Sequence, residues 1–165
     1  MRSYGVHPKR LLTGYVGWLT SRIGANESVL DYGCGDGHVL NALKLMGHKG
    51  GQVGLDRDGV VIGSVRPQYD VAILSNILEH LPNPTIFLHD QIRTSRILIR
   101  VPLFDREWRV AVKKDQGVKY FLDKEHIQEL TAIEWANLLK FSGWQVIEEE
   151  THWGEWWAVC TRIPK

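Results

Sequence analysis

Two carboxylates flank a glycine-rich turn near the start of the chain. The turn is Gly33-Cys34-Gly35-Asp36-Gly37; Asp31 lies just before it, and Asp56 follows about twenty residues later. Glycines lack a Cβ, so they allow a sharp bend and the close approach of a ligand to the backbone. A carboxylate on the next strand can accept two hydrogen bonds from a ribose diol. These residues therefore predict a nucleotide-binding unit.

The elements around the turn are expected to position it. Residues 28–32 predict a short buried strand, residues 38–46 a helix, and residues 52–56 a second strand that ends at Asp56. This order puts the turn at a helix N-terminus, where backbone N–H groups are available to a ligand.

The glycine spacing and the acids around the turn argue against a dinucleotide ligand. A dinucleotide site uses Gly-x-Gly-x-x-Gly to hold a pyrophosphate, whereas here the third glycine comes one residue early. Asp31 and Asp36 would repel a pyrophosphate, but they suit a ligand with a cationic end. S-adenosylmethionine (SAM) carries an ammonium and a sulfonium, and it fits this pattern.

Three segments, in order, resemble the motifs of class I SAM-dependent methyltransferases. Residues 29–37 resemble the first motif, residues 54–57 the acidic tip of the second strand, and residues 70–84 the motif of the fourth strand. The resemblance covers most of the chain. It implies an α/β fold, a Rossmann-like three-layer sandwich whose mostly parallel sheet ends in a C-terminal antiparallel hairpin. It also implies a single domain over residues 1–165.

The same resemblance implies roles for individual residues. The positions that it assigns to the cofactor are Asp31, Gly33, Cys34, Gly35, Asp36, Asp56, Arg57, Ser75 and Asn76. Asp31 would anchor the methionine ammonium, Asp56 would hold the ribose hydroxyls, and Arg57 would lie along the adenine. His80 would sit near the methyl group or the substrate mouth.

One segment departs from the family pattern. Only about a dozen residues separate Asp58 from Asp70, too few for a helix and a strand of normal length. No acid lies between them to meet the adenine amine. We therefore expect the helix after the second strand to be shortened or missing, or the third strand to be vestigial.

The remaining chain predicts alternating helices and strands. Thr131 and Glu134 have the spacing of a capping box. Residues 103–130 predict an irregular polar stretch, and the last two strands predict an antiparallel hairpin. The other predicted elements are helices at 8–23, 84–95 and 131–141, and strands at 70–75, 96–101, 144–149 and 156–162.

His126 is the first candidate for a general base. Methyl transfer from a sulfonium depends mainly on proximity and alignment, so a base matters only if the acceptor must lose a proton. An imidazole titrates near neutral pH and suits that task. A helix cap or a solvent-facing side chain is the alternative for His126, and pocket lining is the favoured role for His80. Arg106 and Arg109 are read either as an anion clamp or, by preference, as a solvated charged loop.

Composition and charge argue against a nucleic-acid-binding, membrane-spanning or secreted protein. The net charge is +1, so nothing in the bulk charge favours nucleic acid or an anionic membrane. No signal peptide and no apolar run of membrane-spanning length is evident. The two cysteines lack metal-ligand spacing, so we expect no metal and a cytoplasmic protein. The tryptophans from Trp108 onward predict core packing, a homodimer contact or a substrate wall.

The leading hypothesis is a SAM-dependent methyltransferase acting on an oxygen or nitrogen atom of a small molecule, such as a sugar or a lipid-linked intermediate. The alternative is a SAM- or SAH-binding module of the same fold without turnover, where SAH is S-adenosylhomocysteine. A short dehydrogenase is disfavoured because Tyr120 and Lys124 lie in a polar loop rather than on a helix. A nucleic-acid methyltransferase is disfavoured because Ser75-Asn76-Ile77-Leu78 is not a base-flipping motif.

Overall fold

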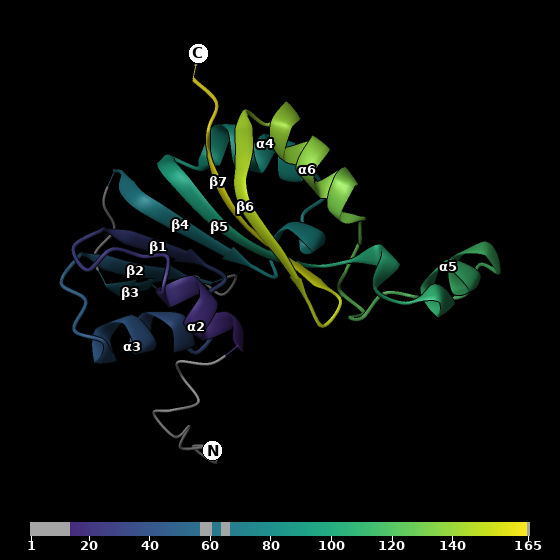
Figure 1. Cartoon of the computed structure of the whole chain (residues 1–165), viewed down its shortest axis with the longest axis horizontal. Helices are drawn as coiled ribbons and strands as arrows, with labels where there is room; N and C mark the ends of the chain where they lie inside the picture. The colour runs from purple at the N-terminus through teal and green to yellow at the C-terminus, as the bar shows by residue number, and fades with distance from the viewer. Residues whose placement is uncertain (1–13, 57–60, 64–66, 165) are drawn as a thin grey trace. The chain divides into compact units, whose positions relative to one another are not determined.

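The computed structural model describes residues 14–56, 61–63 and 67–164. Its strands are β1 (Val29–Tyr32), β2 (Gln52–Leu55), β3 (Val61–Gly63), β4 (Tyr69–Ser75), β5 (Thr94–Pro102), β6 (Trp144–His152) and β7 (Glu155–Arg162). They form a mixed seven-stranded sheet in the order β3-β2-β1-β4-β5-β7-β6 (Figure 1). Together with the helices, this sheet confirms the expected α/β fold class. The chain divides within β4 into two compact units, residues 1–73 and 74–165, and each is described by itself.

The first unit contains the expected strand, turn, helix and strand. β1 and β2 are parallel, with Asp31 opposite Gly54. Helix α3 (His38–Leu45) follows the turn and packs against β2 and against helix α2 (Gly14–Thr20) (Figure 1). It buries Val39, Leu40, Ala42 and Leu43. The helix predicted over 8–23 is thus present from residue 14 but ends at Thr20, and residues 8–13 lie outside the described part.

β3 bears out the expected irregularity after the second strand. It is only three residues long and runs antiparallel to β2, with Val53 opposite Gly63. Gly63 has a φ of +92°, and a Cβ there would lie 2.1 Å from the Gln52 carbonyl oxygen, so the close pairing requires glycine. In the described residues between β2 and β4 there is no helix.

The second unit contains the C-terminal antiparallel strands of the sheet. β7 pairs antiparallel with both β5 and β6, and β6 and β7 form the predicted hairpin. Helix α6 (Ala132–Phe141) begins with the predicted capping box of Thr131 and Glu134, and it packs on β6 (Figure 1). Trp135, Trp144, Trp156 and Trp157 are all buried, so most of the C-terminal tryptophans are core residues.

Two predictions in the second unit need correction. The helix expected over 84–95 is a single turn, α4 (Pro84–Ile86), followed by a π-helical turn, η2 (Phe87–Gln91). It ends there because Ile92 has an extended backbone, with φ −84° and ψ 111°, and β5 begins at Thr94. The stretch expected to be irregular contains a short turn, η3 (Phe104–Arg106), and a helix, α5 (Trp108–Asp115).

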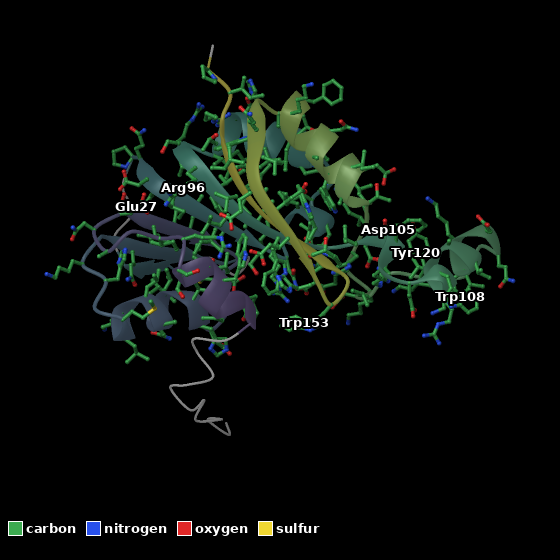
Figure 2. All side chains as sticks on the ribbon, viewed as in Figure 1. Glu27, Arg96, Asp105, Trp108, Tyr120 and Trp153 are labelled. Carbon is green, nitrogen blue, oxygen red and sulfur yellow. The ribbon has the colours of Figure 1, made fainter. Side chains whose placement is uncertain are left out.

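Helix α5 buries only Val110, which explains why its sequence carries no apolar helical face. Trp108 on α5 and Trp153 at the hairpin turn are 75% and 80% exposed (Figure 2). Among the described helices, none combines the length and apolar character required to cross a membrane.

Candidate functional site

The glycine turn of the first unit is fixed by hydrogen bonds to the end of β2. The backbone N–H groups of Gly33 and Cys34 both donate to the carbonyl oxygen of Leu55, at 2.6 and 3.0 Å. Gly33, Gly35 and Gly37 all have positive φ, at 67°, 49° and 72°. This left-handed conformation costs glycine little and other residues considerably more, so the sequence of the turn follows from its shape.

The turn leaves room beside its backbone. A Cβ at Gly35 would meet no atom within 4 Å. Within the described part of the chain, the N–H groups of Gly35 and Asp36 have no hydrogen-bond acceptor. These donors lie at the N-terminus of α3, where the helix dipole favours a negative group. The turn can therefore receive a carboxylate from a ligand.

Asp31 is a buried acid beside this turn. Asp31 is only 3% exposed. Among the described residues, no group donates a hydrogen bond to its carboxylate. Burial, reinforced by the nearby carboxylate of Asp56, raises the pKa of Asp31 to about 7. A cation placed here would restore the ionised form, so the site suits an ammonium group.

The other predicted residues of the turn have clear positions. The Cys34 sulfur lies 2.6 Å from the point that a Cβ on Gly54 would occupy, so Cys34 packs against β2. Burial, together with Asp31 and Asp56, raises the pKa of the Cys34 thiol, which argues against a nucleophilic role. The Asp36 carboxylate is exposed, 3.9 Å from His38. Arg57 lies outside the described residues.

Ser75 and Asn76 lie at the end of β4, in the second unit. Asn76 has a φ of +55°, and its N–H donates to the Arg100 carbonyl oxygen at 2.8 Å. Its side-chain oxygen is buried with no hydrogen-bond partner in the described part of the chain. The Ser75 hydroxyl accepts from Arg100 at 3.3 Å, and the Arg100 guanidinium forms two hydrogen bonds of 2.6 Å to Glu155.

The two predicted histidines meet in the second unit. His80 ends the short helix η1 (Leu78–His80), and its ring lies edge-on to that of His126, with 4.7 Å between ring centroids. His126 is 8% exposed, which excludes the solvent-facing alternative. Its Nδ1 is 2.8 Å from the Glu129 carboxylate, and its Nε2 is 4.0 Å from the Glu79 carboxylate.

Glu79 and Glu129 were not predicted as site residues. Glu79 is fully buried, and burial raises its pKa to about 8; Arg100 opposes that rise, while Glu129 and Glu155 add to it. The available signals were an acid next to His80 and an acid three residues after His126. Arg106 forms a buried ion pair with Glu129, so it is neither an anion clamp nor part of a solvated loop.

The predicted residues therefore form two groups. The first unit holds the turn with Asp31 and Asp56, and the second unit holds the end of β4 and the pair of histidines. The first group contains the buried acid Asp31, and the second contains the buried acids Glu79 and Glu129 together with the side-chain oxygen of Asn76, which has no hydrogen-bond partner among the described residues. Such groups are concentrated at functional sites.

The chain matches the family described as methyltransferase domain over residues 10–149. It therefore belongs to that family, and its fold is that of the class I SAM-dependent methyltransferases. No curated protein sequence matches the chain significantly.

Solved structures support the same fold. A putative methyltransferase in complex with the Haloferax volcanii Trm112 activator has a TM-score of 0.68 and 12% identity, covering 90% of this chain and 88% of that one. The O-methyltransferase NcsB1 from neocarzinostatin biosynthesis, solved with SAM and a naphthoic acid, has a TM-score of 0.65 and 17% identity, covering 94% and 55%. The small RNA methyltransferase HEN1 has a TM-score of 0.62 and 14% identity, and this chain spans 27% of its length.

Proposed function

We propose that this chain binds SAM through the turn of residues 33–37 and transfers its methyl group to an acceptor. The observation that carries the proposal is Asp31, a buried acid without a described partner whose pKa burial raises to about 7. The methionine ammonium would pair with Asp31, and the methionine carboxylate would accept from the N–H groups of the turn. Asp56, directly after β2, would accept from the ribose hydroxyls.

The acceptor in this proposal is an oxygen or nitrogen atom of a small molecule, with sugars and lipid-linked intermediates as the first classes to test. The neighbouring rings of His80 and His126 favour a hydroxyl acceptor, because an imidazole nitrogen can take the hydroxyl proton. NcsB1, a structural neighbour, is an O-methyltransferase solved with a hydroxylated naphthoic acid, so phenolic acids belong in the same panel.

Isothermal titration with SAM and SAH tests cofactor binding directly. We expect binding by the unmodified chain and a loss of at least tenfold in affinity for Asp31→Asn and for Asp56→Ala. Asp115→Asn is the matched control, because Asp115 is an exposed acid at the end of α5, and we expect its affinity to be unchanged. No heat at millimolar SAM, or full affinity in Asp56→Ala, would remove the basis of the proposal.

A SAH-binding module without turnover is the second candidate. The short antiparallel β3 favours it, because the family pattern has a longer element on the adenine side. Transfer of label from methyl-tritiated SAM to a panel of sugars, lipid-linked sugars and phenolic acids separates the two. Labelled product supports the enzyme, whereas SAH binding without any product supports the module.

A further inference from the structure

Three potential metal ligands converge in the second unit. Glu79, His80 and His126 each offer one ligand atom, and these atoms all lie within 4.8 Å of one another. Bonds of about 2.1 Å in a tetrahedral arrangement separate ligand atoms by about 3.4 Å. Rotation of His80, the only one of the three that is partly exposed, would bring its nitrogen closer, while Glu79 Oε1 and His126 Nε2, 4.0 Å apart, would have to approach by about 0.6 Å.

Hydrogen bonds indicate which nitrogen of each imidazole keeps a lone pair for a metal. His126 Nδ1 lies 2.8 Å from the Glu129 carboxylate, and an ionised carboxylate only accepts, so Nδ1 carries the proton. His80 Nδ1 lies 3.3 Å from the Glu125 carbonyl oxygen, which also only accepts. With Nδ1 protonated, Nε2 of each neutral ring presents a lone pair. A carboxylate or carbonyl partner on the far nitrogen is the arrangement that orients histidine ligands of metals.

Glu79 completes the set with a buried carboxylate, whose raised pKa is opposed only by its own backbone N–H and by the charge of Arg100. It is fully buried, and neither of its oxygens has a hydrogen-bond partner in the described part of the chain. The nearest imidazole nitrogen, His126 Nε2, is 4.0 Å away, too far for a hydrogen bond. With a pKa raised to about 8, Glu79 holds a proton when nothing else is bound, and a metal ion between its carboxylate and the imidazole lone pairs would take the place of that proton.

The backbone holds this arrangement in place. The N–H groups of Ile127 and Gln128 donate to the Glu79 carbonyl oxygen at 3.1 and 3.3 Å. The Gln128 side chain donates to the carbonyl oxygens of Leu78 and Leu81 at 3.1 and 3.0 Å. The loop with His126 is thereby tied to the turn with Glu79 and His80, so the ligands are preorganised.

We propose that Glu79, His80 and His126 bind a divalent transition-metal ion. Two imidazole nitrogens and one carboxylate oxygen suit Zn²⁺, Fe²⁺ or Mn²⁺ better than Ca²⁺, which prefers oxygen ligands throughout. Three protein ligands leave at least one position for water or a substrate oxygen. The sequence expectation of a metal-free protein rested on cysteine spacing, and ligands about 45 residues apart in the chain escape that test.

The site also has a role that rests on the proposed methyl transfer. A hydroxyl oxygen bound to the ion would lose its proton to water more readily, so the ion would replace the imidazole nitrogens, which are then its ligands, in activating the acceptor. The oxygen would form its bond to the methyl carbon as the carbon–sulfur bond of SAM breaks and SAH leaves. This role predicts that acceptors with a hydroxyl, above all a pair of adjacent hydroxyls, are preferred over amines. Binding of the ion itself does not depend on the role.

Titration of the untagged chain with Co²⁺ and Zn²⁺, without SAM, tests the site. We expect a single ion per chain, the visible absorption of Co²⁺ with nitrogen ligands, and displacement of Co²⁺ by Zn²⁺. Affinity should fall 10- to 100-fold or more in Glu79→Gln and His80→Gln. Glu79→Gln should fold, because glutamine has the shape of the protonated acid that burial favours. His89→Gln is the matched control, because His89 is exposed on η2 and outside the cluster, and it should bind as the unmodified chain does.

Absence of Co²⁺ absorption at millimolar metal, or equal affinity in Glu79→Gln and the unmodified chain, would overturn the site. Calorimetry with SAH on the same samples keeps this result separate from the cofactor proposal. If the chain binds metal but not SAH, only the proposed function is contradicted. If it binds SAH but not metal, only the metal site is contradicted. Once an acceptor is found, a rate that falls with EDTA and recovers with Zn²⁺ or Mn²⁺ supports the role in catalysis, and a rate insensitive to both contradicts that role.

Discussion

The Glu129 carboxylate lies 2.8 Å from His126 Nδ1, and both side chains are buried. The same carboxylate accepts from the Leu122 N–H at 2.7 Å and forms the ion pair with Arg106. Arg106 in turn donates to the Leu103 and Tyr120 carbonyl oxygens, both at 2.8 Å. The orientation of the His126 ring is therefore set by a buried network rather than by contact with solvent.

Replacing Arg106 should destabilise the chain strongly. Arg106→Met leaves the Glu129 charge buried without its cation, which costs about 3–5 kcal/mol of unfolding free energy. Arg109→Met is the control, because the ion pair of Arg109 with Glu107 is solvent-exposed and should contribute about 1 kcal/mol or less. Urea unfolding of both variants measures the difference, and equal midpoints would contradict the network.

Asp31→Asn should stabilise the unliganded chain at alkaline pH. The pKa of Asp31 is about 7 in the folded chain and 3.8 when unperturbed, so the folded state binds the proton more tightly. Ionisation of Asp31 therefore lowers stability progressively from about pH 4 to pH 7, by about 4 kcal/mol in all. Unfolding experiments should show that Asp31→Asn has nearly the same unfolding free energy as the unmodified chain at pH 4 and a clearly higher one at pH 8. A variant that is less stable than the unmodified chain at pH 8 would contradict the burial argument.

Affinity for SAH should depend on pH through the same residue. The ammonium of the ligand pairs with ionised Asp31, and below pH 7 that ionisation must accompany binding. The dissociation constant should fall up to about tenfold per pH unit from pH 5 to pH 7 and then level off. Calorimetry across this range measures it. Asp31→Asn should bind weakly with no such slope, and a slope that persists in the variant would assign the proton to another group.

Gly154→Ala should destabilise the tip of the β6–β7 hairpin. Gly154 has a φ of +80°, and a Cβ there would lie 2.7 Å from the Arg106 Cβ. Strain and overlap together should cost about 2–3 kcal/mol. Gly117→Ala is the control, since Gly117 has a φ of +67° with nothing within 4 Å and should show the strain alone, about 1 kcal/mol. Chemical denaturation distinguishes them, and equal losses would show that the contact with Arg106 is unimportant.

The features predicted well from sequence are those set by local chemistry. The turn of residues 33–37 follows from its glycines, and α6 begins at Thr131 because Thr131 and Glu134 cap each other. The hairpin follows from two strand segments, residues 144–152 and 155–162, joined by a short turn containing Gly154. In each case the residues that define the element lie within a few positions of one another.

The features that were missed depend on contacts between distant residues. Helix α5 carries Arg109, Lys113 and Lys114 and buries a single valine, so no periodic apolar pattern marks it. The third strand pairs antiparallel with β2, a register set by Gly63 rather than by any pattern of its own. The ligand set of Glu79 and His126 forms only when the loop folds back on η1. Single-sequence reasoning found the histidines but not the acids that orient them.

Gly154 packs close to Arg106, so a continuous chain of contacts joins the hairpin turn to the His126 imidazole. The Gly154 carbonyl oxygen also accepts from the Leu103 N–H at 2.9 Å, next to Arg106 in the fold. The Arg106 guanidinium contacts Glu129, and Glu129 contacts the His126 ring. The length of the hairpin turn that carries the exposed Trp153 is therefore constrained by the packing around Arg106 as well as by the sheet.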